Sequence, residues 1–481
     1  MINTGLLTPG SHRAAELLDD RAVARAVLLT EAAWVAAQSR LGLVPEDIAR
    51  VARDAVDRVP LDETALNRLA VASEGGGNPV IPLLADYRAA VKELHGSPVG
   101  AVHKSLTSQD VMDTALALVL KAAQDSMVSD LRRTGDALAG LVERHAETVM
   151  VGRTLTQHAL PISFGLKAAS WLAGVDDAAR DVFERAHLPV SYGGASGTLA
   201  AGMSLCDQGG GADETAKRLF TLIDYWAEEL GLAVPDQVWH TDRVPVLRVA
   251  GALAETTAAL GRMANDVLLM SRPEVGELRE PTAPGRGVSS AMPQKQNPVL
   301  SVLLKRTALA APHLLGHVNS GAAAAVDERP DGGWHAEWPA LRELAVLTTA
   351  AASHAAELTE GLTVNAERMA HNLRDAGTGV MAERLSAALT PVLSESDGST
   401  AKQRVQAAVR EHPVDAEALA DHLTDLVMAE GAPSLPEGVN PQDRGSVGAW
   451  LGQLLDPRGY LGATQQLCTR AVKNHRERLI A

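Results

Sequence analysis

Long segments almost free of helix-breaking residues restrict the fold of this chain more than any other feature. Residues 111–145, 244–270 and 299–311 form three such segments, and a fourth runs from about residue 338 to 362. Within 244–270, apolar side chains recur at the i, i+3, i+4 spacing of one buried helical face. Asp242 and Pro245 are typical of a helix start there. The repeating positions are Val246, Leu247, Ala250, Leu253, Ala254, Thr257, Leu260, Met263, Ala264 and Val267.

The composition favours the same fold. Hydrophobic residues make up 46% of the 481 residues but aromatic residues only 3%, so the core must consist mainly of Ala, Leu and Val, which are mostly good helix formers. We therefore predict an all-α protein with a long central helix bundle. The breaks in the helical pattern predict three domains, at residues 1–109, 110–362 and 363–481. We find no internal repeat and no convincing strand alternation.

The charge balance limits the possible partners. There are 44 basic and 59 acidic residues, a formal net charge of −15, which argues against binding to nucleic acid or an anionic membrane. Cys206 and Cys468 lie far apart and form no CxxC motif, and no apolar run reaches the length of a membrane span. We expect a soluble cytoplasmic protein. An anionic substrate would need a local cluster of positive groups.

The sequence indicates neither a metal site nor a cofactor. His313 and His317 have the i, i+4 spacing that can bind zinc, but no acidic residue lies between them and no cysteine accompanies them. The glycine clusters match neither the dinucleotide nor the phosphate-loop motif. We therefore expect no metal and no cofactor.

Three polar stretches interrupt the helical background. The first, "SLTSQDVMDT", comes directly before a long helix. Its side chains could simply cap that helix, or Thr107 and Ser108 could bind an anion at the helix N-terminus. The second, "GRTLTQHALPISFG", contains Thr154, Gln157 and His158. These could be ordinary surface residues, or they could orient a carboxylate and supply a group that titrates near neutral pH.

The third stretch, "GRGVSSAMPQKQNP", is the most informative. Glycines before it and prolines within it suit a mobile loop, here residues 283–298. A plain linker would not explain why Lys295 and Asn297 follow two serines so closely. Proton abstraction beside a carboxylate needs a base and donors that stabilise the developing charge. A serine base would need help from Lys295 and loop amides. "GVSSA" also has a weak likeness to the nucleophile motif of serine hydrolases, but no strand precedes it.

This loop resembles the GSSxMPxKxNP signature of the fumarase/aspartase superfamily, with Val288 in place of the first glycine. Further stretches, among them "TSQDVMDTAL", "GGASGTLAA" and "WHTDR", are similar to the bacterial 3-carboxy-cis,cis-muconate cycloisomerase branch. The resemblance covers essentially the whole chain. Leu155 replaces the histidine usual in adenylosuccinate lyases and fumarases, so those activities are not expected. The matching signature residues are Ser289, Ser290, Met292, Pro293, Lys295, Asn297 and Pro298.

The resemblance implies a three-domain, all-helical homotetramer whose active sites each combine three subunits. It implies that Ser289 is the general base, that Lys295 and Asn297 stabilise an aci-carboxylate intermediate, and that His158 is in the position of an acid. The implied substrate contacts are Thr107, Ser108, Thr154, Gln157, Ser290 and Met292, with Arg243 and Arg329 as additional carboxylate clamps.

Departures from the branch pattern lie near these positions and predict a different ligand. Gln294 and Gln296 replace a histidine and an arginine, and Lys104 precedes "SLTSQD". The resemblance extends to nitrosuccinate lyases, which form fumarate and nitrite. We expect a β-elimination lyase for a small succinate-type dicarboxylate, nitrosuccinate being the narrower hypothesis and the muconate cycloisomerase activity the alternative. A purely structural role, as in lens proteins of this superfamily, fits poorly with retention of Ser289, Lys295 and Asn297.

Overall fold

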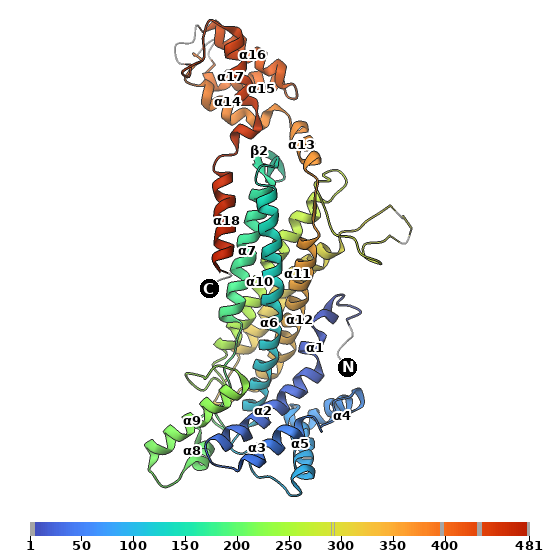
Figure 1. Ribbon diagram of the computed structural model, residues 1–481, viewed down its shortest axis with the longest axis vertical. Helices are drawn as coiled ribbons and strands as arrows, with labels where there is room; N and C mark the ends of the chain where they lie inside the picture. The colour runs from blue at the N-terminus through green and yellow to red at the C-terminus, as the bar shows by residue number, and fades with distance from the viewer. Residues whose placement is uncertain (1–4, 290, 293, 395–398, 431–434, 479–481) are drawn as a thin grey trace. The chain divides into compact units, whose positions relative to one another are not determined.

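The computed structural model describes residues 5–289, 291, 292, 294–394, 399–430 and 435–478, and it is predominantly helical (Figure 1). This confirms the predicted all-α class. The long helices are α6 (Ser108–Arg144), α7 (Phe164–Arg185), α10 (Val244–Met270), α11 (Val299–Ala323) and α12 (Gly332–Glu360). Before them come η1 (Ser11–Ala14), α1 (Ala15–Leu18), α2 (Asp20–Arg40), α3 (Glu46–Val56), α4 (Glu63–Ser73), η2 (Glu74–Gly76) and α5 (Val80–His95).

Shorter helices complete the chain. Helices α8 (Ala200–Cys206) and α9 (Ala212–Leu230) lie between α7 and α10 in the sequence. The C-terminal part contains α13 (Ala366–Asp375), η3 (Thr378–Met381), α14 (Ala382–Leu389), α15 (Ala401–Glu411), α16 (Ala416–Ala429), α17 (Arg444–Leu455), η4 (Pro457–Tyr460) and α18 (Thr464–Arg478).

Helix α10 shows how the sequence pattern becomes a buried face. Asp242 accepts a hydrogen bond from the backbone N–H of Val244 at 3.1 Å, so the predicted start signal is confirmed. Leu247 and Ala254 are half-buried. Burying each large aliphatic side chain contributes about 1.5–3 kcal/mol, which makes this face the main reason the helix forms here. The fully buried positions of the predicted stripe are Val246, Ala250, Leu253, Thr257, Leu260, Met263, Ala264 and Val267.

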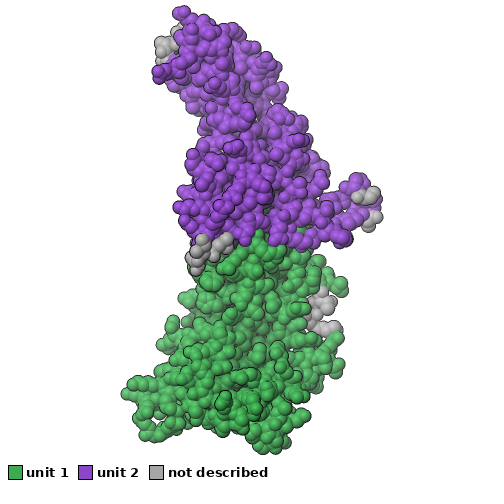
Figure 2. Space-filling model, in the orientation of Figure 1, with its two compact units in different colours: residues 1–133, 177–264, 300–356 green, residues 134–176, 265–299, 357–481 purple. Residues whose placement is uncertain are grey.

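The residues group into two compact units, each built from separate segments of the chain (Figure 2). Unit 1 comprises residues 1–133, 177–264 and 300–356, and unit 2 comprises residues 134–176, 265–299 and 357–481. The three-domain division drawn from the sequence remains a prediction.

Unit 1 concentrates the scarce aromatic residues. The Trp34 ring lies 5.1 Å from both Tyr192 and Trp226, measured between centroids, and all three side chains are buried. Trp34 also donates from its indole N–H to the carbonyl of Lys104 at 2.7 Å. Tilted and edge-on aromatic pairs of this kind stabilise a core beyond the area they bury. They tie α2 and α9 to the segment that precedes α6.

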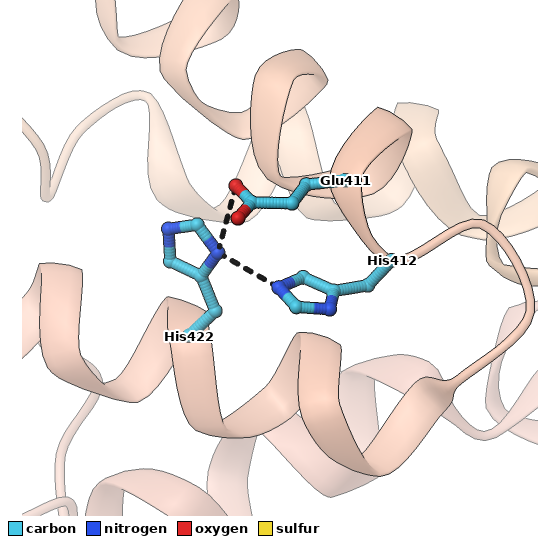
Figure 3. A group of neighbouring side chains, drawn as sticks. All are labelled: Glu411, His412 and His422. Atoms are coloured by element: carbon cyan, nitrogen blue, oxygen red, sulfur yellow. Dashed lines mark hydrogen bonds and ion pairs between the residues drawn. The ribbon is translucent and has the colours of Figure 1, made fainter.

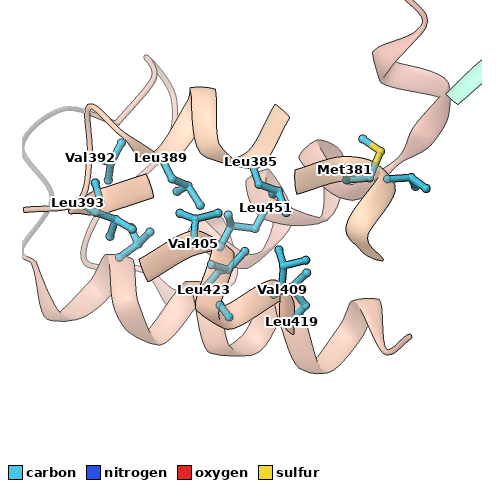
Figure 4. Packing of buried hydrophobic residues seen from close by; sticks show 14 of the residues in the cluster. Met381, Leu385, Leu389, Val392, Leu393, Val405, Val409, Leu419, Leu423 and Leu451 are labelled. Carbon is cyan, nitrogen blue, oxygen red and sulfur yellow. The ribbon is translucent and has the colours of Figure 1, made fainter. Parts of the chain in front are cut away.

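Unit 2 contains an aliphatic core formed by its C-terminal helices (Figure 4). Amphipathic helices α14, α15, α16 and α17 direct their leucine and valine side chains inward. Leu385, Leu389, Val405, Leu419, Leu423 and Leu451 are fully buried in it.

Two small sheets differ from the sequence expectation of no strands. Strands β1 (Val149–Thr154) and β2 (Gln157–Ser163) form an antiparallel hairpin, and β3 (Leu278–Arg279) pairs with β4 (Thr363–Val364). The hairpin lacked an alternating signal because three consecutive β1 residues, from Met150 to Gly152, are buried. A side chain at Gly152 would collide with the carbonyl of Leu160, which explains the glycine where the pairing shifts register.

Among the described residues, none of the helices combines the length and apolar character that crossing a bilayer would demand.

Candidate active site

The N-terminus of α6 brings together two predicted site residues from distant parts of the sequence. Arg329 donates a hydrogen bond from Nη1 to Oγ1 of Thr107 at 2.9 Å, although 222 positions separate them. Ser108 is the first residue of the helix. A guanidinium has five N–H donors, and the contact with Thr107 uses one of them. An arginine beside the positive end of a 37-residue helix is suited to binding a carboxylate.

Asp110 holds this helix start in place. Its Oδ2 accepts from the backbone N–H of Thr107 at 2.9 Å, so the helix-cap interpretation of this stretch is correct for Asp110. Its Oδ1 accepts from Nε2 of His240 at 2.7 Å and from the backbone N–H of Gly193 at 2.8 Å. The carboxylate is fully buried and accepts a fourth bond from Gly194 at 3.2 Å. Asp110 therefore fastens the "GGASG" turn to the start of α6.

Arg243 does not lie in the exposed position that a carboxylate clamp for substrate would need. It is 3% exposed, and its guanidinium pairs with Asp113, at 2.8 Å, and with Glu337. Burial opposes its charge, but the two carboxylates still raise the pKa of Arg243 above its ordinary value. Burial also raises the pKa of Glu337, against the pull of Arg243. The indole of Trp334 donates to Asp113 at 2.9 Å. In this structure Arg243, directly before α10, connects the start of that helix to α6 and α12 through buried ion pairs.

The second polar stretch forms the tip of the β1–β2 hairpin. Thr154 pairs with Gln157, so Leu155 and Thr156 make a two-residue turn. Both have positive φ, 48° and 69°, as a type I′ turn requires. Leu155 is 96% exposed, and Thr154, Gln157 and His158 are exposed as well. The turn thus presents a hydroxyl, an amide and an imidazole on one hairpin end.

A buried ion pair anchors this hairpin and was not predicted from the sequence. Arg153 makes a two-pronged contact with the fully buried Glu277, at 2.9 and 2.7 Å. Asn372 of α13 donates to the same carboxylate at 2.8 Å. The only signal in the sequence is an arginine next to Thr154, which by itself is not distinctive.

The third stretch is closed at its base by backbone pairing. Val288 and Gln296 form an antiparallel bridge, and both the backbone N–H and the side-chain amide of Asn297 donate to the carbonyl of Gly287, at 2.9 and 3.1 Å. Gly287 has φ of 68°, and a Cβ there would lie 2.5 Å from the carbonyl oxygen of Asn297. This close approach explains the glycine. Arg286 adds an ion pair with Glu357 of α12.

Within the loop, backbone amides converge on the candidate base. Oγ of Ser289 accepts from the backbone N–H of Met292 at 3.1 Å and of Ala291 at 3.4 Å. Lys295 is exposed, and its backbone N–H donates to the carbonyl of Met292 at 3.0 Å. In Figure 1 this segment, yellow-green on the bar, extends away from the helices of unit 2. Ser290 and Pro293 lie outside the described residues.

The predicted site residues fall in both units. Unit 1 contains Thr107, Ser108, Arg243 and Arg329, whereas unit 2 contains Thr154, Gln157, His158, Ser289, Met292, Lys295 and Asn297. Within unit 1 the structure joins Thr107 with Arg329, and within unit 2 it joins Thr154 with Gln157. Sequence reasoning did not predict the structural roles of three buried polar residues, Asp110, His240 and Glu277. Their partners come from distant parts of the chain, so no local pattern marks them.

Comparisons with known proteins identify the family of this chain. A family model described as a lyase matches residues 13–311. A nitrosuccinate lyase of Streptomyces davaonensis is 41% identical over 98% of this chain and 95% of its own length. A 3-carboxy-cis,cis-muconate cycloisomerase of Bradyrhizobium diazoefficiens is 36% identical over 97% and 96%. The crystal structure of the 3-carboxy-cis,cis-muconate lactonizing enzyme from Pseudomonas putida matches with a TM-score of 0.79 at 32% identity, covering 97% of each chain. The chain therefore belongs to the fumarase/aspartase superfamily of lyases and is an enzyme.

Proposed function

We propose that the protein is a β-elimination lyase for a small succinate-type dicarboxylate, and that nitrosuccinate is its substrate. The observation that carries the mechanistic part is the pair of loop amides donating to Oγ of Ser289, at 3.1 and 3.4 Å. Donors aimed at a hydroxyl oxygen stabilise its deprotonated form, which a serine base requires. The likeness to the nitrosuccinate lyase over nearly the whole chain supports the choice of substrate.

In the proposed reaction, Ser289 removes a proton from the carbon next to the one that carries the nitro group. The C–H electrons move onto the neighbouring carboxylate, where Lys295 and one N–H of Asn297 stabilise the charge of the aci-carboxylate. The C–N bond then breaks, the double bond of fumarate forms, and nitrite leaves with the bonding electrons. Because nitrite is a weak base, its departure needs little help from a general acid, so His158 has at most a secondary part in this reaction.

The substrate carboxylates would be held by the groups that present donors. Thr107 with Arg329, and Thr154 with Gln157, are the two pairs that we propose for this purpose. Ser108, Ser290 and Met292 remain proposed contacts. We do not assign a substrate contact to Arg243, because its guanidinium is buried between Asp113 and Glu337.

Ultraviolet absorbance at the fumarate band, combined with a nitrite assay, tests the proposal. We expect fumarate and nitrite in equal amounts from nitrosuccinate. Ser289→Ala should lower kcat by on the order of 10²–10⁴-fold, the usual contribution of a general base, with an unchanged circular dichroism spectrum. The matched control is Ser204→Ala, an exposed serine of α8, which should keep full turnover. Near-normal turnover of Ser289→Ala would show that the base is another group.

The cycloisomerase activity is the second candidate, because the related enzymes and solved structures include several of that kind. The same assay run with 3-carboxy-cis,cis-muconate separates the two. Consumption of the muconate without any turnover of nitrosuccinate would replace the elimination proposal and make Gln294 and Gln296 tolerated differences.

A further inference from the structure

One group of three potential metal ligands converges among the described residues, and it belongs to none of the site stretches. Glu411 is the last residue of α15, His412 follows it, and His422 lies on the next helix, α16 (Figure 3). Nε2 of His412 lies 3.0 Å from Nδ1 of His422, and Oε2 of Glu411 lies 3.6 Å from the same Nδ1. All three ligand atoms are within 4.8 Å of one another.

The distances between these ligand atoms match those expected around one shared cation. Zinc binds histidine nitrogen at about 2.0–2.1 Å and carboxylate oxygen at about 2.0–2.2 Å, so neighbouring ligand atoms of a tetrahedral site are about 3.4 Å apart. The two distances that meet at His422 lie on either side of that value. The Glu411 side chain is 65% exposed, so a rotation about its side-chain bonds can bring the third edge to the required length.

Hydrogen bonding alone does not satisfy all the contacts among the two imidazole rings and the carboxylate, whereas a bound cation would. Nδ1 of His422 can hold either one proton or one lone pair, yet it faces both a second imidazole nitrogen and a carboxylate oxygen. One hydrogen bond satisfies only one of the two contacts. A divalent ion would accept a lone pair from each of the three groups at once.

The backbone beneath the cluster is fixed, whereas the ligand atoms reach solvent. Thr378 donates from Oγ1 to the carbonyl of His412 at 2.8 Å and from its backbone N–H to the carbonyl of Pro413 at 2.9 Å. Leu419 and Leu423, on the same helix as His422, are fully buried in the C-terminal core. The His422 side chain is 30% exposed, so an ion could enter from solvent.

We infer that Glu411, His412 and His422 form a binding site for a zinc-type divalent cation, with a fourth position open to water. Two imidazoles and one carboxylate are a ligand set that zinc uses elsewhere. The bound ion would link the end of α15 to α16 and so stabilise the C-terminal core of unit 2. This inference differs from the expectation of no metal, which was based on His313 and His317 and did not consider these three residues.

Titration of the metal-stripped, untagged full chain with Co²⁺ and Zn²⁺ tests this site. We expect one Co²⁺ per chain with the visible ligand-field bands of a tetrahedral centre, displacement by Zn²⁺, and a higher Tm with Zn²⁺. Loss of a group that only orients a ligand costs metal affinity about 10–100-fold, so loss of a direct ligand in His422→Ala or His412→Ala should cost at least about tenfold. Glu411→Gln should weaken binding less, because the amide oxygen of glutamine can still coordinate the ion, although less strongly than a carboxylate.

The matched control is the double variant His313→Ala, His317→Ala, which removes an exposed i, i+4 pair on α11. It should bind Co²⁺ as the wild type does and show the same Tm increase. The proposal is overturned if the wild type takes up no Co²⁺ in a tetrahedral site. It is also overturned if both His422→Ala and His412→Ala, folded by circular dichroism, bind as tightly as the wild type.

Discussion

At the residue scale, buried charge distinguishes groups that hold the fold from groups that can meet a substrate. Arg243 and Arg329 both resemble carboxylate clamps in the sequence. In the structure, Arg243 lies between two buried carboxylates, whereas Arg329 is half-buried and contacts the hydroxyl of Thr107. We therefore expect substitution of Arg243 to lower stability and substitution of Arg329 to weaken substrate binding.

Replacing Arg243 by alanine should lower the free energy of unfolding. The change leaves Asp113 and Glu337 buried without their cation, which costs about 3–5 kcal/mol in the free energy of unfolding. Chemical denaturation measures the loss. Arg185→Ala is the control, since it breaks an exposed ion pair with Glu255 and should cost less than about 1 kcal/mol. Equal losses in the two variants would show that Arg243 has no special structural role.

At the scale of single elements, the β1–β2 turn contains local strain. Thr156 is β-branched and has φ of 69°, a conformation that costs an L-residue about 1–2 kcal/mol and suits glycine. Thr154 and Gln157 flank it and are proposed substrate contacts. Strain retained at such a place is compatible with a functional requirement on the turn.

We expect Thr156→Gly to raise the free energy of unfolding by about 1 kcal/mol. Thr156→Ala, which keeps a Cβ but removes the branch, should gain less. If the strained turn holds Thr154 and Gln157 in place, the glycine variant should also show a higher KM. A variant that is less stable than the wild type would mean that the threonine side chain makes a favourable contact that outweighs the strain.

Helix α18 is attached by a titratable contact. His475 is buried, its Nδ1 lies 2.7 Å from Asp176 of α7, and its Nε2 lies 3.2 Å from Asp136 of α6. Arg478 lies 3.9 Å from the same Asp176. The hydrogen bond to Asp176 is the main cause that raises the pKa of His475, against the effect of burial.

The sign of the pH effect follows from that direction. A folded-state pKa above the unfolded value of about 6.5 means that the contact stabilises fully below pH 6.5 and loses its effect as pH rises through the folded-state pKa. The Tm difference between wild type and His475→Gln should therefore be larger at acidic than at alkaline pH. Taking the difference cancels the titration of the other histidines. A difference that grows towards alkaline pH would contradict the assignment.

At the scale of the whole molecule, the proposed catalytic residues are divided between two compact units. Ser289, Lys295 and Asn297 belong to unit 2, and Thr107 and Arg329 to unit 1. We propose a homotetramer in which three subunits contribute to each active site, so that residues of one chain can serve different sites.

Complementation tests this assembly. Ser289→Ala and Thr107→Ala should each lower activity strongly as homo-oligomers. Co-expressed, they should regain part of the wild-type activity, because some sites then combine an intact Ser289 with an intact Thr107 from different chains. Light scattering gives the oligomeric state, and native mass spectrometry verifies that mixed oligomers form. Verified mixed oligomers without regained activity would mean that each site takes both residues from one chain.

The sequence by itself determined the helical class and the buried face of α10, because periodicity is a local property. Turn composition, which is also local, predicted the segments of the candidate site. It also contained the loop signature that identifies the superfamily. Tertiary structure decided what local patterns cannot encode. It assigned Arg243 to a buried ion-pair network and Arg329 to Thr107, and it paired β1 with β2 although their alternation was weak. It also brought Glu411, His412 and His422 together. In each case the partner comes from another element, and a side chain's charge and hydrogen bonds depend on which partner the fold supplies.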